Sequence, residues 1–135
     1  MGIRQFMDLY ILIVDNEPDI ADIVRRYLEF EGFTTACVTS CEAARAACAA
    51  RMPDAIVLDW KLPDVDGDAW VAALRADPAT SDVPIVLMTC AYPTKALVSQ
   101  MAAASVPILI KPFSLDLLLD HIGRMLPRQR EIGAE

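Results

Sequence analysis

Four short apolar runs, each ended by one polar residue, constrain the fold of this chain more than any other feature. The runs, with the residues that end them, are LYILIVD (9–15), DAIVLD (54–59), VPIVLMT (83–89) and VPILIK (106–111). Apolar, β-branched runs of this length are typical of strands buried on both faces of a parallel sheet. A fifth run, GFTTACVT (32–39), starts with a glycine and alternates less cleanly, which favours a strand nearer the sheet edge.

Patterns of helical spacing separate these five segments. Pro18 occupies a helix-starting position, and apolar residues then recur at helical spacing as far as Glu31, at Ile20, Ile23, Val24, Tyr27 and Leu28. Further helices are expected from a cap at Ser40 to about residue 51, around residues 70–74, from Thr94 and from Ser114. The sequence therefore predicts five strand–helix units in succession.

Alternating strands and helices predict a three-layer α/β domain, in which right-handed crossovers cover both faces of a five-stranded parallel sheet. In open sheets of this kind, sites form beyond the carboxyl ends of the strands, where the strand order reverses. The polar residues that follow the apolar runs are therefore expected to gather at one rim of the sheet: Asp15, Asn16, Asp59, Thr89 and Lys111.

Length and composition exclude several classes of protein. A chain of 135 residues fits one domain, expected over residues 9–126, between an N-terminal extension (1–8) and a polar C-terminal tail (127–135). No apolar run approaches the roughly 20 residues of a membrane span. The N-terminus lacks the features of a signal peptide, so a cytoplasmic protein without a membrane partner is expected. The net charge of −7 disfavours nucleic acid as a partner, because its binding rests on phosphate neutralisation.

The four cysteines, Cys37, Cys41, Cys48 and Cys90, fit neither a C-x-x-C motif nor a zinc-binding spacing. A disulfide framework is not expected either, because the chain is not of the short secreted type. Reduced thiols buried as small core residues are therefore expected.

The residue types at the predicted rim suit phosphoryl transfer. Crowded carboxylates favour a hard cation, and Mg²⁺ takes oxygen ligands from carboxylates, waters and phosphate. Asp59 is a candidate nucleophile towards phosphorus, which would give an aspartyl phosphate. Mg²⁺, the Lys111 ammonium and the Thr89 hydroxyl would then stabilise the phosphoryl oxygens.

The motifs around these residues resemble the receiver domains of two-component response regulators. ILIVDNEPDI (11–20) resembles the acidic pair of that family, IVLDWKLPDVDG (56–67) its phosphoacceptor strand and D-x-x-L-P-x-x-D-G loop, PIVLMTC (84–90) its switch-threonine strand, and ILIKPF (108–113) its lysine-proline-phenylalanine motif. Four motifs in order make the resemblance specific over about residues 9–126. It implies a flavodoxin-like, doubly wound fold with strand order 2-1-3-4-5.

By this resemblance, Asp59 would accept a phosphoryl group from a histidine kinase or a histidine phosphotransfer protein. The domain would signal by docking to proteins and would be no enzyme beyond its own phosphorylation and dephosphorylation. Asp15, Asn16, Asp59 and the backbone carbonyl of Lys61 would hold Mg²⁺. Thr89 would hydrogen-bond the phosphoryl group and Lys111 would pair with it, and the peptide bond between Lys111 and Pro112 would be cis.

Two departures from the family pattern bear on function. The second acidic residue of the family, a direct metal ligand, is here Asn16, which brings no charge, so weaker Mg²⁺ binding is expected unless Glu17 compensates. Ile108 stands where the family often has an aromatic switch residue, three positions before the lysine. Both departures favour an alternative, a pseudo-receiver that serves as an interaction or dimerisation module with a degenerate acidic pocket.

A third hypothesis is a flavodoxin-like cofactor binder or a small phosphotransfer enzyme. The loop after the first strand opposes it, because that loop lacks a Gly-rich or Ser/Thr-rich phosphate cradle. Asn16 and Glu17 would also repel a phosphate in the absence of a metal ion.

The expected fourth and fifth helices carry more apolar residues than one buried stripe requires, Leu117 among them. Receivers commonly pair or dock through the surface of the fourth helix, fifth strand and fifth helix, so a downstream partner or a homodimer is expected there. The alternative is a set of scattered exposed apolar residues, which is common on monomeric proteins.

Overall fold

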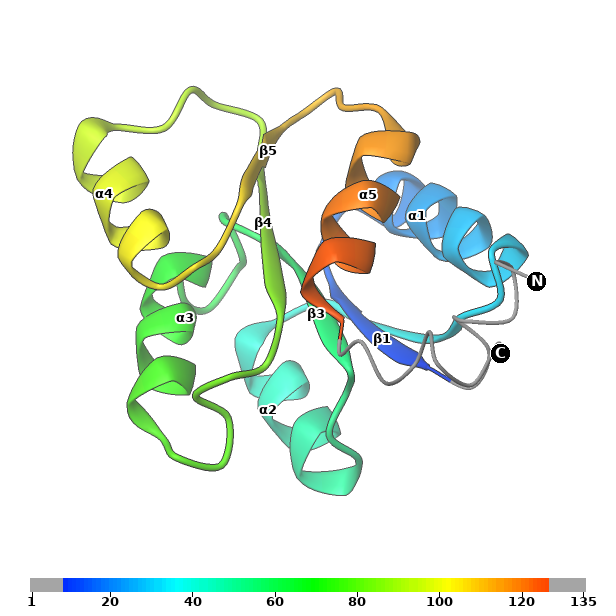
Figure 1. The fold of residues 1–135 in the computed structure, drawn as a ribbon, viewed down its shortest axis with the longest axis horizontal. Helices are drawn as coiled ribbons and strands as arrows, with labels where there is room; N and C mark the ends of the chain where they lie inside the picture. Colours follow the sequence, from blue (N-terminus) through cyan, green and yellow to red (C-terminus); the bar gives the residue numbers. More distant parts are fainter. Residues whose placement is uncertain (1–8, 127–135) are drawn as a thin grey trace.

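The computed structural model describes residues 9–126, which form five strands and five helices in strict alternation (Figure 1). The strands are β1 (Tyr10–Val14), β2 (Thr34–Val38), β3 (Ala55–Asp59), β4 (Ile85–Thr89) and β5 (Ile108–Ile110). The helices are α1 (Pro18–Phe30), α2 (Cys41–Ala50), α3 (Gly67–Ala76), α4 (Lys95–Ala103) and α5 (Leu115–Met125). The predicted order of elements is confirmed, and the expected extension (1–8) and tail (127–135) lie outside the described residues.

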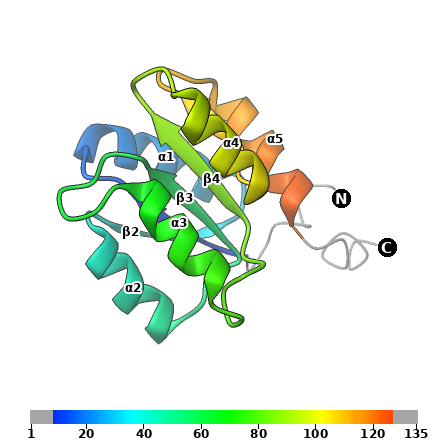
Figure 2. The same cartoon turned by 90° about the vertical axis from the view of Figure 1, so that its left-hand side faces the viewer.

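The strands form one parallel sheet in the order β2-β1-β3-β4-β5, which confirms the predicted flavodoxin-like topology. Helices α1 and α5 cover one face of the sheet, and α2, α3 and α4 cover the other (Figures 1 and 2). Because the strand order reverses between β1 and β3, the loops that leave these two strands diverge and open a site between them. None of the helices within residues 9–126 is long and apolar enough to cross a membrane.

The three central strands, β1, β3 and β4, are buried along their whole length. Successive residues alternate between two cores: Ile11 and Ile13 of β1 pack with α1 and α5, whereas Leu12 and Val14 pack with the helices of the other face. Burying each such aliphatic side chain contributes roughly 1.5–3 kcal/mol. The rigid sheet that results fixes the positions of the polar residues at its carboxyl edge.

Three of the helices begin at a hydroxyl cap, which confirms the predicted cap at Ser40 and the predicted helix starts at Thr94 and Ser114. The Ser40 side chain accepts the backbone N–H of Ala43, Thr94 that of Leu97, and Ser114 that of Leu117. Helix α1 begins differently, with Pro18 in its first turn. Glu17 stands before the helix at the N-cap position, but its side chain accepts no hydrogen bond from a backbone N–H of the helix. The Glu17 carboxylate instead accepts a hydrogen bond from the Lys111 ammonium.

The prediction that all four cysteines are buried is wrong for two of them. Cys41 and Cys48 lie in the core, whereas Cys37 and Cys90 are exposed. Cys37 lies on the edge strand β2, which the helices cover incompletely, and Cys90 follows the last residue of β4. The apolar character of a thiol therefore does not place it in the core.

One residue of the apolar stripe of α1 is not buried. Ile23 is 54% exposed, and the fully buried positions of this helix are Ala21, Val24 and Leu28. Ala21, with its small side chain, is buried in the core on this side of the sheet. Ile23 therefore lies on the surface of the domain, beside Ile20 and Phe113.

Candidate functional site

Three carboxylates meet where β1 and β3 end. Asp15 follows β1, Glu17 precedes α1, and Asp59 is the last residue of β3. One oxygen of each lies within 4.8 Å of an oxygen of both others. Asp15 and Asp59 are 1% and 5% exposed, while Glu17 lies at the surface. The cluster forms because β1 and β3 are neighbouring parallel strands, so the residues that follow them leave the sheet at the same edge.

The ammonium group of Lys111 lies among these carboxylates. Its Nζ is 2.5 Å from Oε1 of Glu17, 3.4 Å from Oδ2 of Asp15 and 3.5 Å from Oδ1 of Asp59, and its side chain is only 7% exposed. Burial alone would lower the pKa of Lys111, but the hydrogen bond to Glu17 and the charges of Asp59 and Asp15 outweigh it and raise the pKa. Lys111 is therefore charged at neutral pH and partly neutralises the cluster.

Asp59 is the carboxylate with the most perturbed acidity in this cluster. The pKa of Asp59 is raised to about 6, mainly by burial and next by the negative charge of Asp15, while the Lys111 ammonium acts in the opposite direction. A buried carboxylate with so high a pKa gains from any additional positive charge near it. A cation at this site would therefore favour the ionised, nucleophilic form of Asp59.

Thr89 ends β4 with a buried hydroxyl beside this cluster. The hydroxyl donates to the backbone oxygen of Ala91 at 3.0 Å and accepts from its N–H at 3.1 Å, so it holds the start of the loop between β4 and α4. A cavity of about 270 Å³ opens between this strand and the acidic cluster. Its lining residues are Asn16, Glu17, Asp59, Lys61, Thr89 and Cys90.

The loop between β3 and α3 forms the opposite wall of the cavity. The Lys61 ammonium lies 3.2 Å from Oδ2 of Asp66 and 4.5 Å from the centroid of the Trp60 ring, so it is held at the rim. The Trp60 indole N–H donates to Oδ1 of Asp68 at 2.7 Å. These contacts give the segment that follows Asp59 a defined shape.

Gly67 explains the glycine of the D-x-x-L-P-x-x-D-G loop. A Cβ at this position would lie 2.6 Å from the backbone oxygen of Asp59 and 3.2 Å from Cα of Trp60. The Gly67 N–H also donates to the backbone oxygen of Trp60 at 2.6 Å. Only a residue without a side chain lets α3 begin this close to the end of β3.

The structure brings most of the residues singled out from the sequence to one place. Asp15, Asp59 and Lys111 are in contact, while Asn16, Lys61 and Thr89 line the adjoining cavity. The peptide bond between Lys111 and Pro112 is cis. Ile108 lies apart from this group, half-buried at the start of β5 and packed against the core beneath α4.

The sequence pointed to Glu17 only as a residue that could compensate for Asn16, and not as a member of the predicted site. Its place follows from the start of α1, where Pro18 fixes the first turn and Glu17 stands before it without capping the helix. The run of three polar residues after β1 was the available signal, but the spacing alone did not show which of Asn16 and Glu17 faces the carboxylates. The structure places the Glu17 carboxylate in the cluster.

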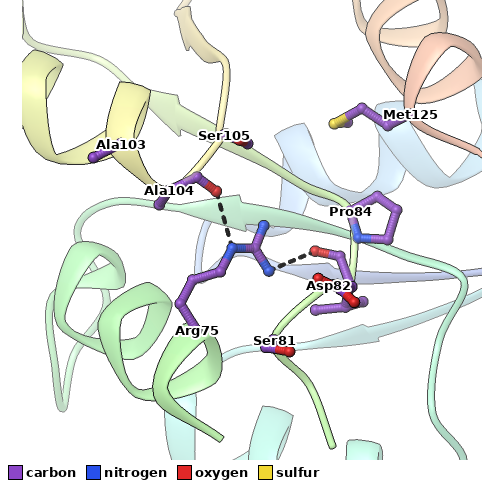
Figure 3. Close-up of a pocket in the computed structure, with 9 residues that line it drawn as sticks. Arg75, Ser81, Asp82, Pro84, Ala103, Ala104, Ser105 and Met125 are labelled. Carbon is purple, nitrogen blue, oxygen red and sulfur yellow. Dashed lines mark hydrogen bonds between the residues drawn. The ribbon is translucent and has the colours of Figure 1, made fainter. Parts of the chain in front are cut away.

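A larger cavity, of about 390 Å³, lies at the other end of the sheet and does not belong to this site. Figure 3 shows Arg75 spanning it, with Nε donating to the backbone oxygen of Ala104 at 2.9 Å and Nη1 to that of Val83 at 2.8 Å. Val83 precedes β4, so this cavity lies near the amino ends of the strands, whereas Asp59 lies at a carboxyl end. Arg75 thus ties the end of α3 to the loop before β4, through Val83, and to the loop after α4, through Ala104.

Comparisons with known proteins identify the class to which this fold and acidic site belong. The model of the response regulator receiver domain matches residues 11–123, and the chain belongs to this family. The family consists of signalling domains.

Particular relatives support the same assignment. The chain is 31% identical to the phosphate regulon transcriptional regulatory protein PhoB of Rhizobium meliloti, over 89% of this chain and 53% of PhoB. It is 36% identical to the transcriptional regulatory protein PrrA of Mycobacterium tuberculosis, over 88% of this chain and 50% of PrrA. The chain thus spans about half the length of these curated relatives.

A solved structure shows the same fold in another setting. The receiver domain of a signal transduction histidine kinase from Syntrophus aciditrophicus matches with a TM-score of 0.78 and 27% identity, over 87% of this chain and 89% of that one. Receiver folds of this kind therefore occur both in response regulators and within kinases.

Proposed function

We propose that this chain is a phosphoacceptor receiver that takes a phosphoryl group on Asp59 from a histidine kinase or a histidine phosphotransfer protein. The observation that carries the proposal is the position of Asp59, a buried carboxylate that contacts Lys111 and borders an open cavity beside Thr89. Phosphoryl transfer depends mainly on positioning and charge stabilisation. The groups around Asp59 supply both.

The donor set at this site fits Mg²⁺, which supplies positive charge to the phosphoryl oxygens when it is bound. Its ligands would be oxygens of Asp15 and Asp59, the amide oxygen of Asn16 and the backbone carbonyl of Lys61. Carboxylates within 4.8 Å of one another are a suitable arrangement of hard oxygen donors. Burial and the charge of Asp15 raise the pKa of Asp59, and a cation bound beside it would oppose both effects.

The residues of the chain have separate roles in the transfer. An oxygen of Asp59 attacks phosphorus, a P–O bond forms, and the P–N bond to the donor histidine breaks with its electron pair returning to the imidazole. Lys111 pairs with the added negative charge, since its ammonium already lies 3.5 Å from Asp59. The Thr89 hydroxyl can donate to a phosphoryl oxygen after it leaves the backbone of Ala91.

We further propose that the domain signals by protein docking through α4, β5 and α5, either with a downstream partner or with a second copy. Figure 1 shows β5 between these two helices. Val98 on α4 and Leu117 on α5 are 47% and 43% exposed, which provides apolar area on this surface. A cytoplasmic location, without nucleic acid or membrane as a partner of residues 9–126, belongs to the same proposal.

A second candidate function is the pseudo-receiver, an interaction module that takes no phosphate. Asn16 in the cavity wall and the aliphatic Ile108 at the start of β5 favour it, because both depart from the family pattern.

Sedimentation of the protein with and without the phosphoryl mimic beryllofluoride would test the proposed docking between two copies of the domain. A strict monomer in both states would exclude the homodimer.

Intact-mass spectrometry after incubation with acetyl phosphate tests the proposed function. We expect one phosphoryl adduct on the wild type in the presence of Mg²⁺, and none after chelation of the metal or in Asp59→Asn. A folded wild-type protein that forms no adduct with acetyl phosphate or with any histidine donor would favour the pseudo-receiver instead. An adduct that persists in Asp59→Asn would contradict the assignment of the acceptor.

A further inference from the structure

Asn16 and Glu17 both line the cavity, but only Glu17 brings a carboxylate into the acidic cluster. A Glu17 oxygen lies within 4.8 Å of oxygens of both Asp15 and Asp59. Two oxygens bound to one Mg²⁺ lie at most about 4.2 Å apart, because each bond is roughly 2.1 Å long. The Glu17 side chain is 52% exposed, so its carboxylate has room to turn towards a bound cation.

The net charge of the site also indicates that Glu17 takes part in binding a cation. The negative charges of Asp15, Glu17 and Asp59, set against the one positive charge of Lys111, leave two negative charges for one divalent cation to neutralise. Without Glu17 only one negative charge would remain, because Asn16 is neutral. Affinity of an oxygen site for a hard cation falls when carboxylates are lost from it.

The contacts of Lys111 leave Glu17 able to change partners. Lys111 Nζ contacts one oxygen of each carboxylate, so Glu17 and Asp59 each keep a second oxygen. If Glu17 turns towards a cation, Lys111 still has Asp15 at 3.4 Å and Asp59 at 3.5 Å. The ammonium therefore does not lose its place beside the acceptor.

We propose that Glu17 replaces the acidic residue that is missing at position 16 and supplies the third carboxylate oxygen to bound Mg²⁺. This inference rests on the proposed function, because it takes Mg²⁺ as the ion that supports transfer to Asp59. It assigns Glu17 as a metal-binding residue, in addition to its hydrogen bond with Lys111.

A double-mutant cycle between positions 16 and 17 tests the proposal by binding of Mg²⁺ alone. The variants are Asn16→Asp, Glu17→Gln and the two combined, with Asp19→Asn as the control, since Asp19 is an exposed acid in the first turn of the same helix. Affinity is measured by isothermal titration calorimetry at constant ionic strength. Fluorescence of Trp60, which follows Asp59, gives a second readout.

We expect Glu17→Gln to weaken Mg²⁺ binding about tenfold or more, and Asp19→Asn to weaken it by no more than about twofold. In the Asn16→Asp background the cost of Glu17→Gln should be several times smaller, because the introduced aspartate then supplies the carboxylate. Thermal unfolding of each variant in EDTA verifies that it is folded.

Three outcomes would overturn the proposal. In the first, Glu17→Gln weakens Mg²⁺ binding no more than the control does. In the second, it weakens Mg²⁺ binding by the same factor with and without Asn16→Asp. Either result would leave Glu17 with only its contact to Lys111 as a role. In either case, loss of binding in Asp15→Asn would keep the metal site and the proposed function intact. A folded wild type that binds no Mg²⁺ would overturn the metal requirement of the proposed function, and this inference with it.

Discussion

The Lys111 ammonium lies 3.5 Å from a carboxylate oxygen of Asp59, and both side chains are 7% exposed. The pair joins the ends of β3 and β5, which are not neighbours in the sheet because β4 lies between them. Lys111 reaches across the end of β4 to the acceptor. Its long side chain thus connects the cis-peptide loop before α5 to the site of phosphorylation proposed above.

Replacing Lys111 with methionine should destabilise the metal-free domain. The substitution keeps the apolar length of the side chain but leaves Asp15 and Asp59 buried without their counter-charge, at a cost of roughly 3–5 kcal/mol. Urea unfolding in EDTA at pH 7 measures the difference. Lys95→Met, at an exposed lysine in the first turn of α4, is the matched control and should change stability by less than about 0.5 kcal/mol. Equal effects of the two substitutions would contradict the prediction.

Asp59→Asn should stabilise the metal-free domain at neutral pH. Because the folded-state pKa of Asp59 is raised from 3.8 to about 6, this group contributes stability that is fully present below pH 3.8 and is lost as the pH rises through about 6. Removing the charge should therefore raise the unfolding free energy at pH 7 by about 3 kcal/mol.

The gain from Asp59→Asn should shrink as the pH falls towards 4, where the wild-type carboxyl is already protonated. Urea titrations in EDTA between pH 4 and pH 7 give the profile. The exposed acid Asp19 offers a control, because Asp19→Asn lies outside the cluster. A gain that is independent of pH would contradict the electrostatic cause.

Gly67→Ala should destabilise the domain and slow phosphorylation of Asp59. Helix propensity alone would make alanine neutral or favourable at this helix position. The added Cβ, however, would lie 2.6 Å from the backbone oxygen of Asp59, so the end of β3 or the start of α3 has to shift. We expect a loss on the order of 2 kcal/mol in thermal unfolding. A variant as stable as the wild type would show that α3 moves without cost.

Arg75→Met should cost about 2 kcal/mol of stability, because it removes charge-assisted hydrogen bonds to two backbone carbonyls. These bonds tie α3 to Val83 and Ala104 (Figure 3). Arg124→Met is the matched control, since the salt bridge of Arg124 with Asp120 is exposed and contributes at most about 0.5 kcal/mol. Chemical denaturation of both variants tests the contrast. Phosphorylation of Asp59 should be unchanged in Arg75→Met, because Arg75 lies at the opposite end of the sheet.

Local sequence determined the strands and helices and their alternation, whereas the strand order of the sheet was expected from the family resemblance. Apolar runs of four to six residues that end in a polar residue are typical of buried strands, and the hydroxyl caps at Ser40, Thr94 and Ser114 specify where three helices begin. Because parallel strands present their carboxyl ends at one edge, Asp15 and Asp59 were expected at one rim, and the strand order implied by the resemblance makes β1 and β3 neighbours there.

Tertiary structure decided what the rim residues touch. The sequence places Asn16 and Glu17 side by side, and only the angle at which α1 leaves β1 brings the Glu17 carboxylate to Lys111 and Asp59. The exposure of Ile23, Cys37 and Cys90 was likewise set by how the helices cover the sheet. Spacing along a chain defines which residues share a strand or a helix face, whereas contact and acidity depend on packing between elements that are distant in sequence.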